Sequence, residues 1–202
     1  ILNSPRRLGS TQTKLGDIGY TDVNGDGKID GEDQVRIGKP TMPHFTYAFD
    51  FSLGYEGFTL SGLLYGTGER YMTFGNRYQS GEGKYLYYEN QLNYWRPDNT
   101  GADFPRISIS SGVNGNNNKA GSTFWMRNAS YLRLKDLQLS YDFKYKYLKR
   151  CDWLQTCRVN LSGSNLFTIS GVSKFFDPET SSTSGDGYPV QRVYSIGVTI
   201  GF

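Results

Sequence analysis

Apolar and polar residues alternate strictly at the end of the chain. Every second position from Tyr194 to Phe202 is apolar, and serine, glycine and threonine lie between them. Because side chains of a strand point to alternate faces, this segment is predicted to be a strand with one apolar and one small, polar face. The alternation reaches the last residue, whereas chain termini usually fray into water. A strand that faces lipid along its whole length needs such an ending, so the pattern favours a transmembrane β-barrel.

A β-hairpin is predicted near residue 56. Apolar side chains alternate with small or polar ones over 45–55, and a second strand runs over about 58–66. A two-residue turn between them would place Tyr55 opposite Phe58 and Phe49 opposite Leu64. The two strands then agree on which face is apolar, although each was assigned separately.

Two further strands are predicted over about 130–143 and 156–168, before the terminal strand at about 191–202. In the first of them Leu132 and Leu134 are out of phase with Leu137 and Leu139. A change of phase within one strand indicates either a β-bulge or an upper end that faces protein.

Loop lengths alternate along the chain. The connections are two residues at 56–57, then long at 67–129, medium at 144–155 and long again at 170–190. Outer-membrane barrels have short periplasmic turns and long external loops, which assigns 67–129 and 170–190 to the outside. The side chains predicted to face lipid are Phe45, Phe49, Leu53, Phe58, Leu60, Leu64, Leu137, Leu139, Val159, Ile196 and Val198. Five strands cannot close a barrel, which needs at least about eight, so we expect the C-terminal strands and external loops of a larger antiparallel barrel.

Composition agrees with this all-β assignment. The 202 residues include 16 Tyr, 12 Phe and 25 Gly, types that suit strands, interfacial girdles and turns. No apolar run reaches the length of a transmembrane helix. The net charge of +3 is spread along the chain without a basic stripe, so nucleic acid is not expected as a partner. The chain begins at Ile1 without a signal peptide, and we expect it to be the end of a longer precursor.

A calcium-loop pattern precedes the first strand. Side-chain oxygens alternate at positions 1, 3, 5, 9 and 12 of the pattern, the residue at position 7 offers its carbonyl, and Gly27 allows the sharp turn. The predicted ligands are Asp22, Asn24, Asp26, Lys28 (carbonyl), Asp30 and Asp33. Position 12 is Asp instead of the usual Glu, and the flanking glycines do not predict EF-hand helices. The alternative is a solvated Asp/Gly turn.

No catalytic arrangement is predicted, and the protein is expected not to be an enzyme. The single His44 follows a proline at a strand start, and no Ser/His/Asp set forms around it. Cys151 and Cys157 fall in one short connection. They either form a disulfide or stay as two free thiols, and the sequence allows both. The aromatic residues of the long loop either bind a ligand or a partner, or pack the loop on itself. They are Tyr71, Phe74, Tyr78, Tyr85, Tyr87, Tyr88, Tyr94 and Trp95.

The order of several short motifs resembles the C-terminal end of SusC/RagA-type TonB-dependent outer-membrane transporters. The motifs are the segments 16–18 and 22–30, 37–40 (IGKP), 94–99 (YWRPDN), 130–135 (SYLRLK), 164–168 (SNLFT) and 194–202. Each is weak alone, but their order and spacing extend over nearly the whole chain. The resemblance implies a 22-stranded barrel with an N-terminal plug in the outer membrane, a SusD-like surface lipoprotein as partner, and a TonB complex that acts through the N-terminal part.

From the resemblance we expect the transport of nutrient oligomers, either glycans or peptides, by the parent protein. Residues 1–44 would be an extracellular loop with the calcium motif, and 45–202 the last five barrel strands. Outer-membrane lipid and the barrel-assembly machinery, which would read Phe202, are the other expected partners. The alternative is a secreted all-β binding or adhesion module with a dockerin-like calcium loop, in which the apolar faces meet inside a sandwich. A surface glycan hydrolase would need a carboxylate pair in a cleft.

Overall fold

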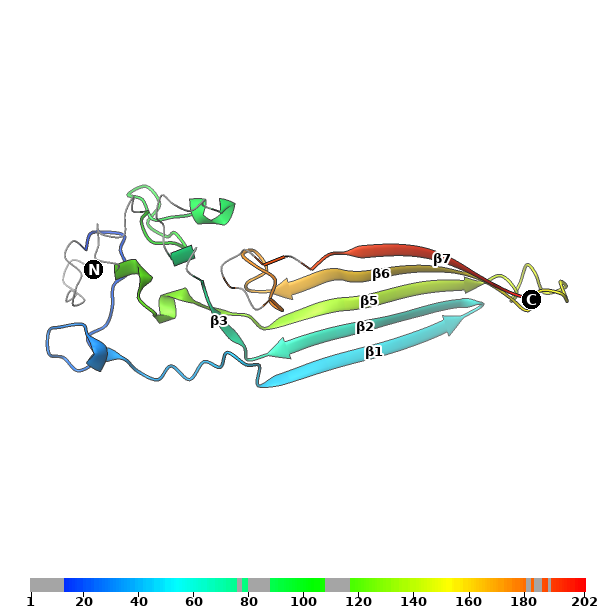
Figure 1. Ribbon diagram of the computed structural model, residues 1–202, viewed down its shortest axis with the longest axis horizontal. Coiled ribbons are helices and arrows are strands. Elements are labelled where there is room, and N and C mark those ends of the chain that lie inside the picture. The colour runs from blue at the N-terminus through cyan, green and yellow to red at the C-terminus, as the bar shows by residue number, and fades with distance from the viewer. Residues whose placement is uncertain are drawn as a thin grey trace.

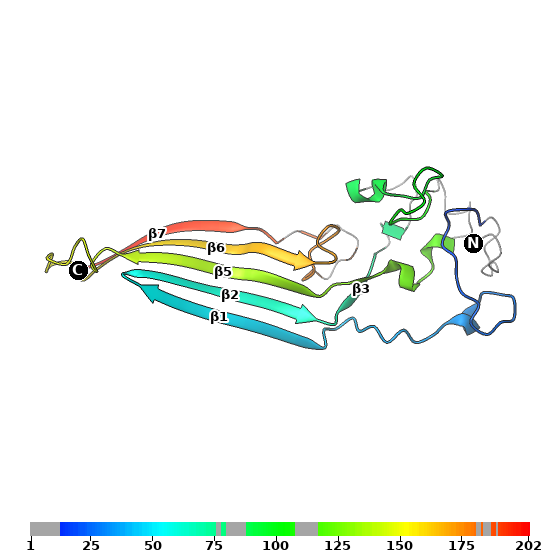
Figure 2. The same ribbon diagram turned by 180° about the vertical axis from the view of Figure 1, so that it is seen from behind.

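The computed structural model describes residues 13–75, 78–79, 88–107, 117–180, 183, 187–188 and 190–202. Within this part the protein is all-β, and the strands run along the long axis of an elongated molecule (Figures 1 and 2). The turn over 143–155 and the C-terminus lie at one end, and the described parts of the long connections lie at the other. No helix in the described ranges is long and apolar enough to span a membrane.

Five strands form one antiparallel sheet in the order β1-β2-β5-β6-β7. They are β1 (Phe45–Tyr55), β2 (Phe58–Gly68), β5 (Tyr131–Asp142), β6 (Thr156–Ser170) and β7 (Val193–Gly201). A separate pair is β3 (Tyr71–Thr73) with β4 (Met126–Asn128), and short 3₁₀ turns are η1 (Gly31–Asp33), η2 (Glu89–Leu92), η4 (Asn117–Lys119) and η5 (Thr123–Trp125). All five predicted strands are therefore confirmed, with ends shifted by a few residues.

The hairpin register is the predicted one. Tyr55 lies opposite Phe58 and Phe49 lies opposite Leu64. Both turn residues have positive φ, 43° at Glu56 and 83° at Gly57, as a two-residue hairpin turn requires. The glycine adopts this conformation at little cost, whereas Glu56 does so because the hydrogen-bonded strands on both sides fix the turn.

A β-bulge in β5 explains the change of phase. Leu134 and Asp136 pair with the consecutive residues Leu64 and Leu63 of β2, and Lys135 between them has no partner in either neighbouring strand. The extra residue returns Leu134 and Leu137 to the same face of the sheet. The predicted bulge is confirmed, and the alternative of a protein-facing upper end is not needed.

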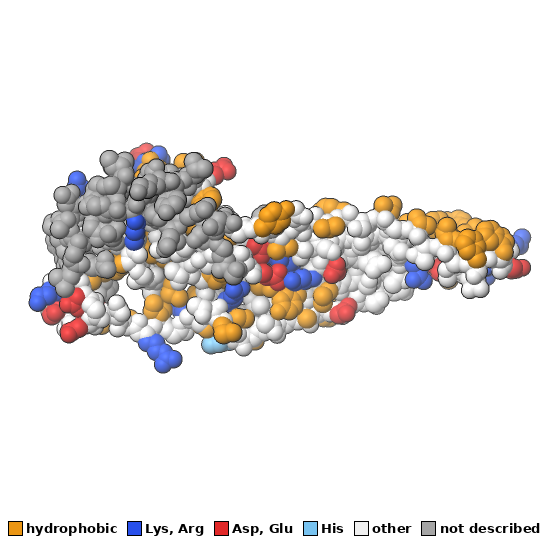
Figure 3. Space-filling model, viewed as in Figure 1, with side chains coloured by type: hydrophobic (Ala, Val, Ile, Leu, Met, Phe, Trp, Pro, Cys, Tyr) orange, Lys and Arg blue, Asp and Glu red, His pale blue; other side chains and the backbone are white. Residues whose placement is uncertain are grey.

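The sheet has one apolar and one polar face, and the apolar face is uncovered. Side chains such as Phe49, Leu53 and Ile196 are 61%, 64% and 74% exposed. The opposite face carries mainly Ser, Thr, Asn and charged residues, and Figure 3 shows acidic and basic side chains gathered where the strands approach the loops. Among the described strands, β1 and β7 each pair on one edge only. This is the arrangement expected of a barrel wall, although the sheet does not close on itself here.

The described parts of the long connections are more ordered than the sequence predicts. The connection over 67–129 was expected to be a long irregular loop, yet it contributes β3, β4 and an aromatic core. Buried side chains from distant segments form that core: Ile18, Met72, Phe74, Tyr78, Phe104, Trp125, Ala129, Val172 and Phe176. Because these residues are far apart in sequence and follow no short period, no local pattern could reveal them.

Candidate functional site

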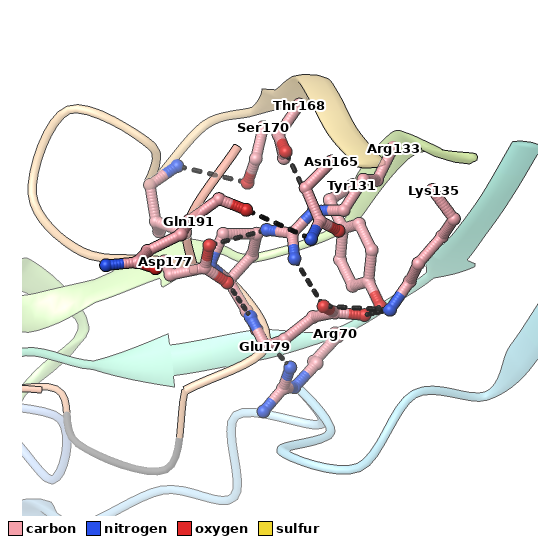
Figure 4. Close-up of polar contacts among 12 residues, drawn as sticks. Arg70, Tyr131, Arg133, Lys135, Asn165, Thr168, Ser170, Asp177, Glu179 and Gln191 are labelled. Atoms are coloured by element: carbon pink, nitrogen blue, oxygen red, sulfur yellow. Dashed lines mark hydrogen bonds and ion pairs between the residues drawn. The ribbon is translucent and has the colours of Figure 1, made fainter. Parts of the chain in front are cut away.

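A buried arginine with two acidic partners lies on the polar face, at the loop end of β5. The Arg133 side chain is 1% exposed and contacts both Asp177 and Glu179 from the connection between β6 and β7 (Figure 4). Its Nε atom also donates to Thr168 Oγ1 over 2.8 Å. We call Arg133, Thr168, Asp177, Glu179 and Lys135 the Arg133 cluster.

Burial makes the cluster sensitive to the loss of any member. Taking a guanidinium out of water costs several kcal/mol, which nearby carboxylates offset only when the geometry is good. Arg133 satisfies this condition because its planar fork contacts one oxygen of each carboxylate and the Thr168 hydroxyl at once. Removal of the cation would leave two partly buried carboxylates facing one another.

Glu179 is the most heavily contacted acid of the cluster. It accepts from Lys135 Nζ at 2.8 Å and from the Tyr131 hydroxyl at 2.5 Å, besides its ion pair with Arg133. Burial alone would raise the pKa of Glu179, but the hydrogen bonds and the two cations outweigh it and hold the pKa below the ordinary value. Glu179 is therefore a carboxylate at neutral pH.

The cluster ties the 171–180 segment to the sheet. Arg70 donates to the Pro178 carbonyl from the other side of the segment, and Val172 and Phe176 enter the aromatic core. The segment therefore packs against both the polar face of the sheet and the aromatic core. The sequence offered no sign of this role, because Arg133 and its carboxylates are 44 and 46 residues apart.

A second buried network holds the segment that precedes the calcium-loop pattern. Asp17 is 3% exposed and accepts from Arg106 Nη2 at 3.0 Å and from Asn118 Nδ2 at 2.9 Å. Asn118 in turn accepts from the Ile18 backbone N–H, and Asn117 donates to the Ile18 carbonyl. These contacts fix residues 17–18 against loops about a hundred positions away, and sequence reasoning missed them.

The predicted calcium ligands lie in one exposed loop and bind its own backbone. Asp22 accepts from the N–H groups of Gly25 and Gly27, at 2.6 and 2.8 Å. Asp33 accepts from Val23 and Asp30, both at 2.8 Å, which holds the pKa of Asp33 below its usual value. Asn24, Asp26 and Asp30 each accept from the residue two positions later.

These contacts give the loop a defined fold but not a preformed set of metal ligands. Within the described ranges, no group of three or more His, Cys, Asp and Glu side chains is placed to hold a metal ion. Ile29 is the buried apolar residue of the loop, with 4% of its surface exposed. The calcium site stays a prediction.

Most of the loop aromatics pack on the protein itself. Phe74 and Tyr78 are buried in the core, and Tyr88 and Tyr94 pack against it. The Trp95 ring covers Gly16, where an added Cβ would come within 2.3 Å of it. Tyr71 lies beneath the Lys39 ammonium group, whereas Tyr85 and Tyr87 lie outside the described residues.

The remaining candidates form no reactive site. Cys151 and Cys157 are both free thiols, so the open question of a disulfide is answered against it. His44 Nδ1 lies 2.5 Å from the exposed Glu69 carboxylate, at the start of β1. No serine or cysteine nucleophile contacts His44 among the interactions of the described chain.

The sequence of the chain was compared with those of known proteins. No protein-family model matches the chain. Two curated relatives from Formosa agariphila do match: TonB-dependent receptor P26 is 27% identical over 202 residues, and TonB-dependent receptor P3 is 26% identical over 196. The matches cover 93% and 91% of this chain but only 20% and 19% of the relatives. The chain therefore spans about a fifth of the length of these receptors.

Solved structures give the same result. The RagAB peptide importer in its open-open state matches 99% of this chain and 21% of its own, with a TM-score of 0.65 and 24% identity. A structure of the RagAB peptide transporter matches 87% of this chain and 19% of its own, with a TM-score of 0.65 and 27% identity. The predicted resemblance to SusC/RagA-type TonB-dependent receptors is confirmed. These are bacterial outer-membrane proteins, and they are receptors and transporters, not enzymes.

Proposed function

We propose, from this likeness to TonB-dependent receptors, that the chain forms wall strands and external loops of an outer-membrane transporter for nutrient oligomers. The observation that carries the proposal is the two-faced sheet, whose apolar face is exposed while its polar face holds an ordered charged cluster. A soluble sandwich would cover such a face, whereas lipid covers it in a barrel. The alternative of a secreted binding module therefore has less support.

Transport by the full-length protein is tested in cells. Uptake of fluorescent short peptides and of fluorescent oligosaccharides is measured with and without the gene. We expect uptake of one of the two classes to need the gene and to fail when the proton gradient is collapsed, because the outer membrane itself supplies no energy. If the deletion strain takes up both classes as fast as the strain with the gene, the transport function is contradicted.

The membrane assignment has its own measurement. The full-length protein should fractionate with the outer membrane and migrate faster on gels before heating than after, because a closed barrel resists detergent. Recovery in the soluble fraction without detergent would favour the secreted module. Deletion of Phe202, whose ring stacks on Trp153 at 5.7 Å between centroids, should reduce the folded species without reducing synthesis.

The partner and the metal are further parts of the proposal. The likeness to the RagAB peptide importer supports a SusD-like lipoprotein lid for the full-length protein. Affinity purification of the full-length protein should recover such a lipoprotein. We also propose that the loop over 22–33 binds one calcium ion with a dissociation constant of about 10⁻⁴–10⁻³ M. Calorimetry without calcium-dependent heat, or with the same heat in Asp22→Asn, would contradict this.

A further inference from the structure

A pocket lies on the polar face beside the Arg133 cluster. Its volume is about 480 Å³, and it is enclosed by the polar face of β5 and β6, the 173–178 segment and the residues that lead into β7. Three cations, Arg133, Lys174 and Arg192, line it together with one acid, Asp177. The pocket is distinct from the calcium loop, and Phe176 of the aromatic core forms part of its wall.

The charges of this pocket are not balanced. Arg133 is neutralised by Asp177 and by Glu179 behind it. Lys174 and Arg192 are exposed, and within the described part of the chain no hydrogen bond or ion pair involves either side-chain cation. Among the described residues, two positive charges therefore face the pocket without a counter-charge, and they attract an anion there.

Each neutral polar side chain of the pocket makes a hydrogen bond within the protein. Asn165 donates to the Gln191 carbonyl at 3.2 Å, Ser173 donates to the Ser170 carbonyl at 3.0 Å, and Thr168 accepts from Arg133. Phe175 and Val190 add apolar surface to the wall. The pocket therefore offers a ligand a pair of cations beside an apolar wall, which suits an acidic group carried on a carbon skeleton.

We propose that this pocket binds a carboxylate group of the transported oligomer through Lys174 and Arg192. The inference rests on the proposed transport function, because the polar face meets a passing ligand only if it lines the path of a transported oligomer. A peptide with an acidic side chain or a free C-terminus carries this group, and so does a glycan with uronic acid residues. The carboxylate is the chemistry that the two share.

The test uses the full-length protein in detergent and four fluorescent probes. These are short peptides with free C-termini, the same peptides amidated and without acidic residues, oligogalacturonate, and its methyl ester. Binding is measured by fluorescence polarisation for the wild type, for Lys174→Gln/Arg192→Gln and for Lys146→Gln/Arg150→Gln. The last variant removes the same two charge types from the exposed turn over 143–155, at the other end of the sheet.

We expect one acidic probe to bind more tightly than its neutral counterpart. The Lys174/Arg192 variant should weaken that probe about three- to tenfold, as expected for two solvent-accessible charge contacts, and the Lys146/Arg150 variant should leave it unchanged. The better of the two acidic probes identifies the peptide or the glycan source. Unchanged heat-modifiable migration of both variants shows that the barrel is folded.

Three results would overturn the inference. They are equal binding of the acidic and neutral probes, equal affinity of the two double variants, and the absence of binding by all four probes. None of them affects the transport function, which gene-dependent uptake tests separately.

Discussion

Glycines of β2 lie directly under aromatic rings of β1, and this packing gives the sharpest prediction. Tyr47 faces Gly66 across the two strands. A Cβ added at Gly66 would lie 2.3 Å from Tyr47 Cζ of β1 and 2.5 Å from the Tyr131 carbonyl oxygen of β5, the other neighbouring strand. The ring can move toward lipid, but the carbonyl belongs to the hydrogen-bonded backbone of β5 and cannot yield cheaply. Gly66→Ala is therefore expected to be destabilising.

The magnitude follows from two opposing effects. Alanine in a strand gains about 0.5–1 kcal/mol over glycine because the unfolded chain loses freedom. Overpacking typically costs about 1–3 kcal/mol, and the close carbonyl at Gly66 places it at the upper end. We expect a net loss of about 2 kcal/mol for Gly66→Ala. Gly68→Ala should cost less, since the three atoms nearest an added Cβ there all belong to the ring of the half-exposed Phe45.

Gly197 in β7 is the matched control, because an added Cβ there meets no atom within 4 Å. Gly197→Ala should be neutral or slightly stabilising. The assay is equilibrium unfolding of the full-length protein by guanidinium in phospholipid vesicles, followed by the loss of heat-modifiable migration. If Gly66→Ala and Gly197→Ala unfold at the same denaturant concentration, the close aromatic packing on β2 is wrong.

Three further predictions concern the two faces of the sheet. In the same unfolding assay, Leu60→Arg should lower the free energy of unfolding by about 2–4 kcal/mol and Ser61→Arg by much less, because only Leu60 faces lipid. Equal losses would contradict the register. Arg133→Met should cost about 3 kcal/mol and speed hydrogen exchange over 171–180, since two carboxylates lose their buried partner, whereas unchanged exchange would show that Arg133 does not anchor this segment. The pKa of Glu179 lies below the ordinary 4.5. Its contribution to the stability of the folded segment is therefore complete above about pH 4.5 and is lost as the pH falls through the folded-state pKa. Exchange over 171–180, corrected for intrinsic rates, should therefore accelerate only in acid, and acceleration between neutral and alkaline pH would contradict this assignment.

The sequence alone determined the strands, their register and their faces. These features depend on a period of two residues and on turn geometry, both of which are local. The hairpin around Glu56 could thus be assigned from neighbouring residues only. Even the bulge at Lys135 was visible, because it reverses the phase between Leu134 and Leu137. The family motifs added the membrane context that the strands by themselves only favoured.

Only the tertiary structure decided how the connecting segments fold and where charge is buried. Arg133 meets Asp177 and Glu179 because the segment after β6 folds back over the polar face, and Asp17 meets Arg106 across 89 positions. Such contacts depend on chain folding in space and leave no periodic trace in the sequence. The loop aromatics show the same limit: their composition allowed either ligand binding or self-packing, and burial in a shared core assigned Phe74 to self-packing.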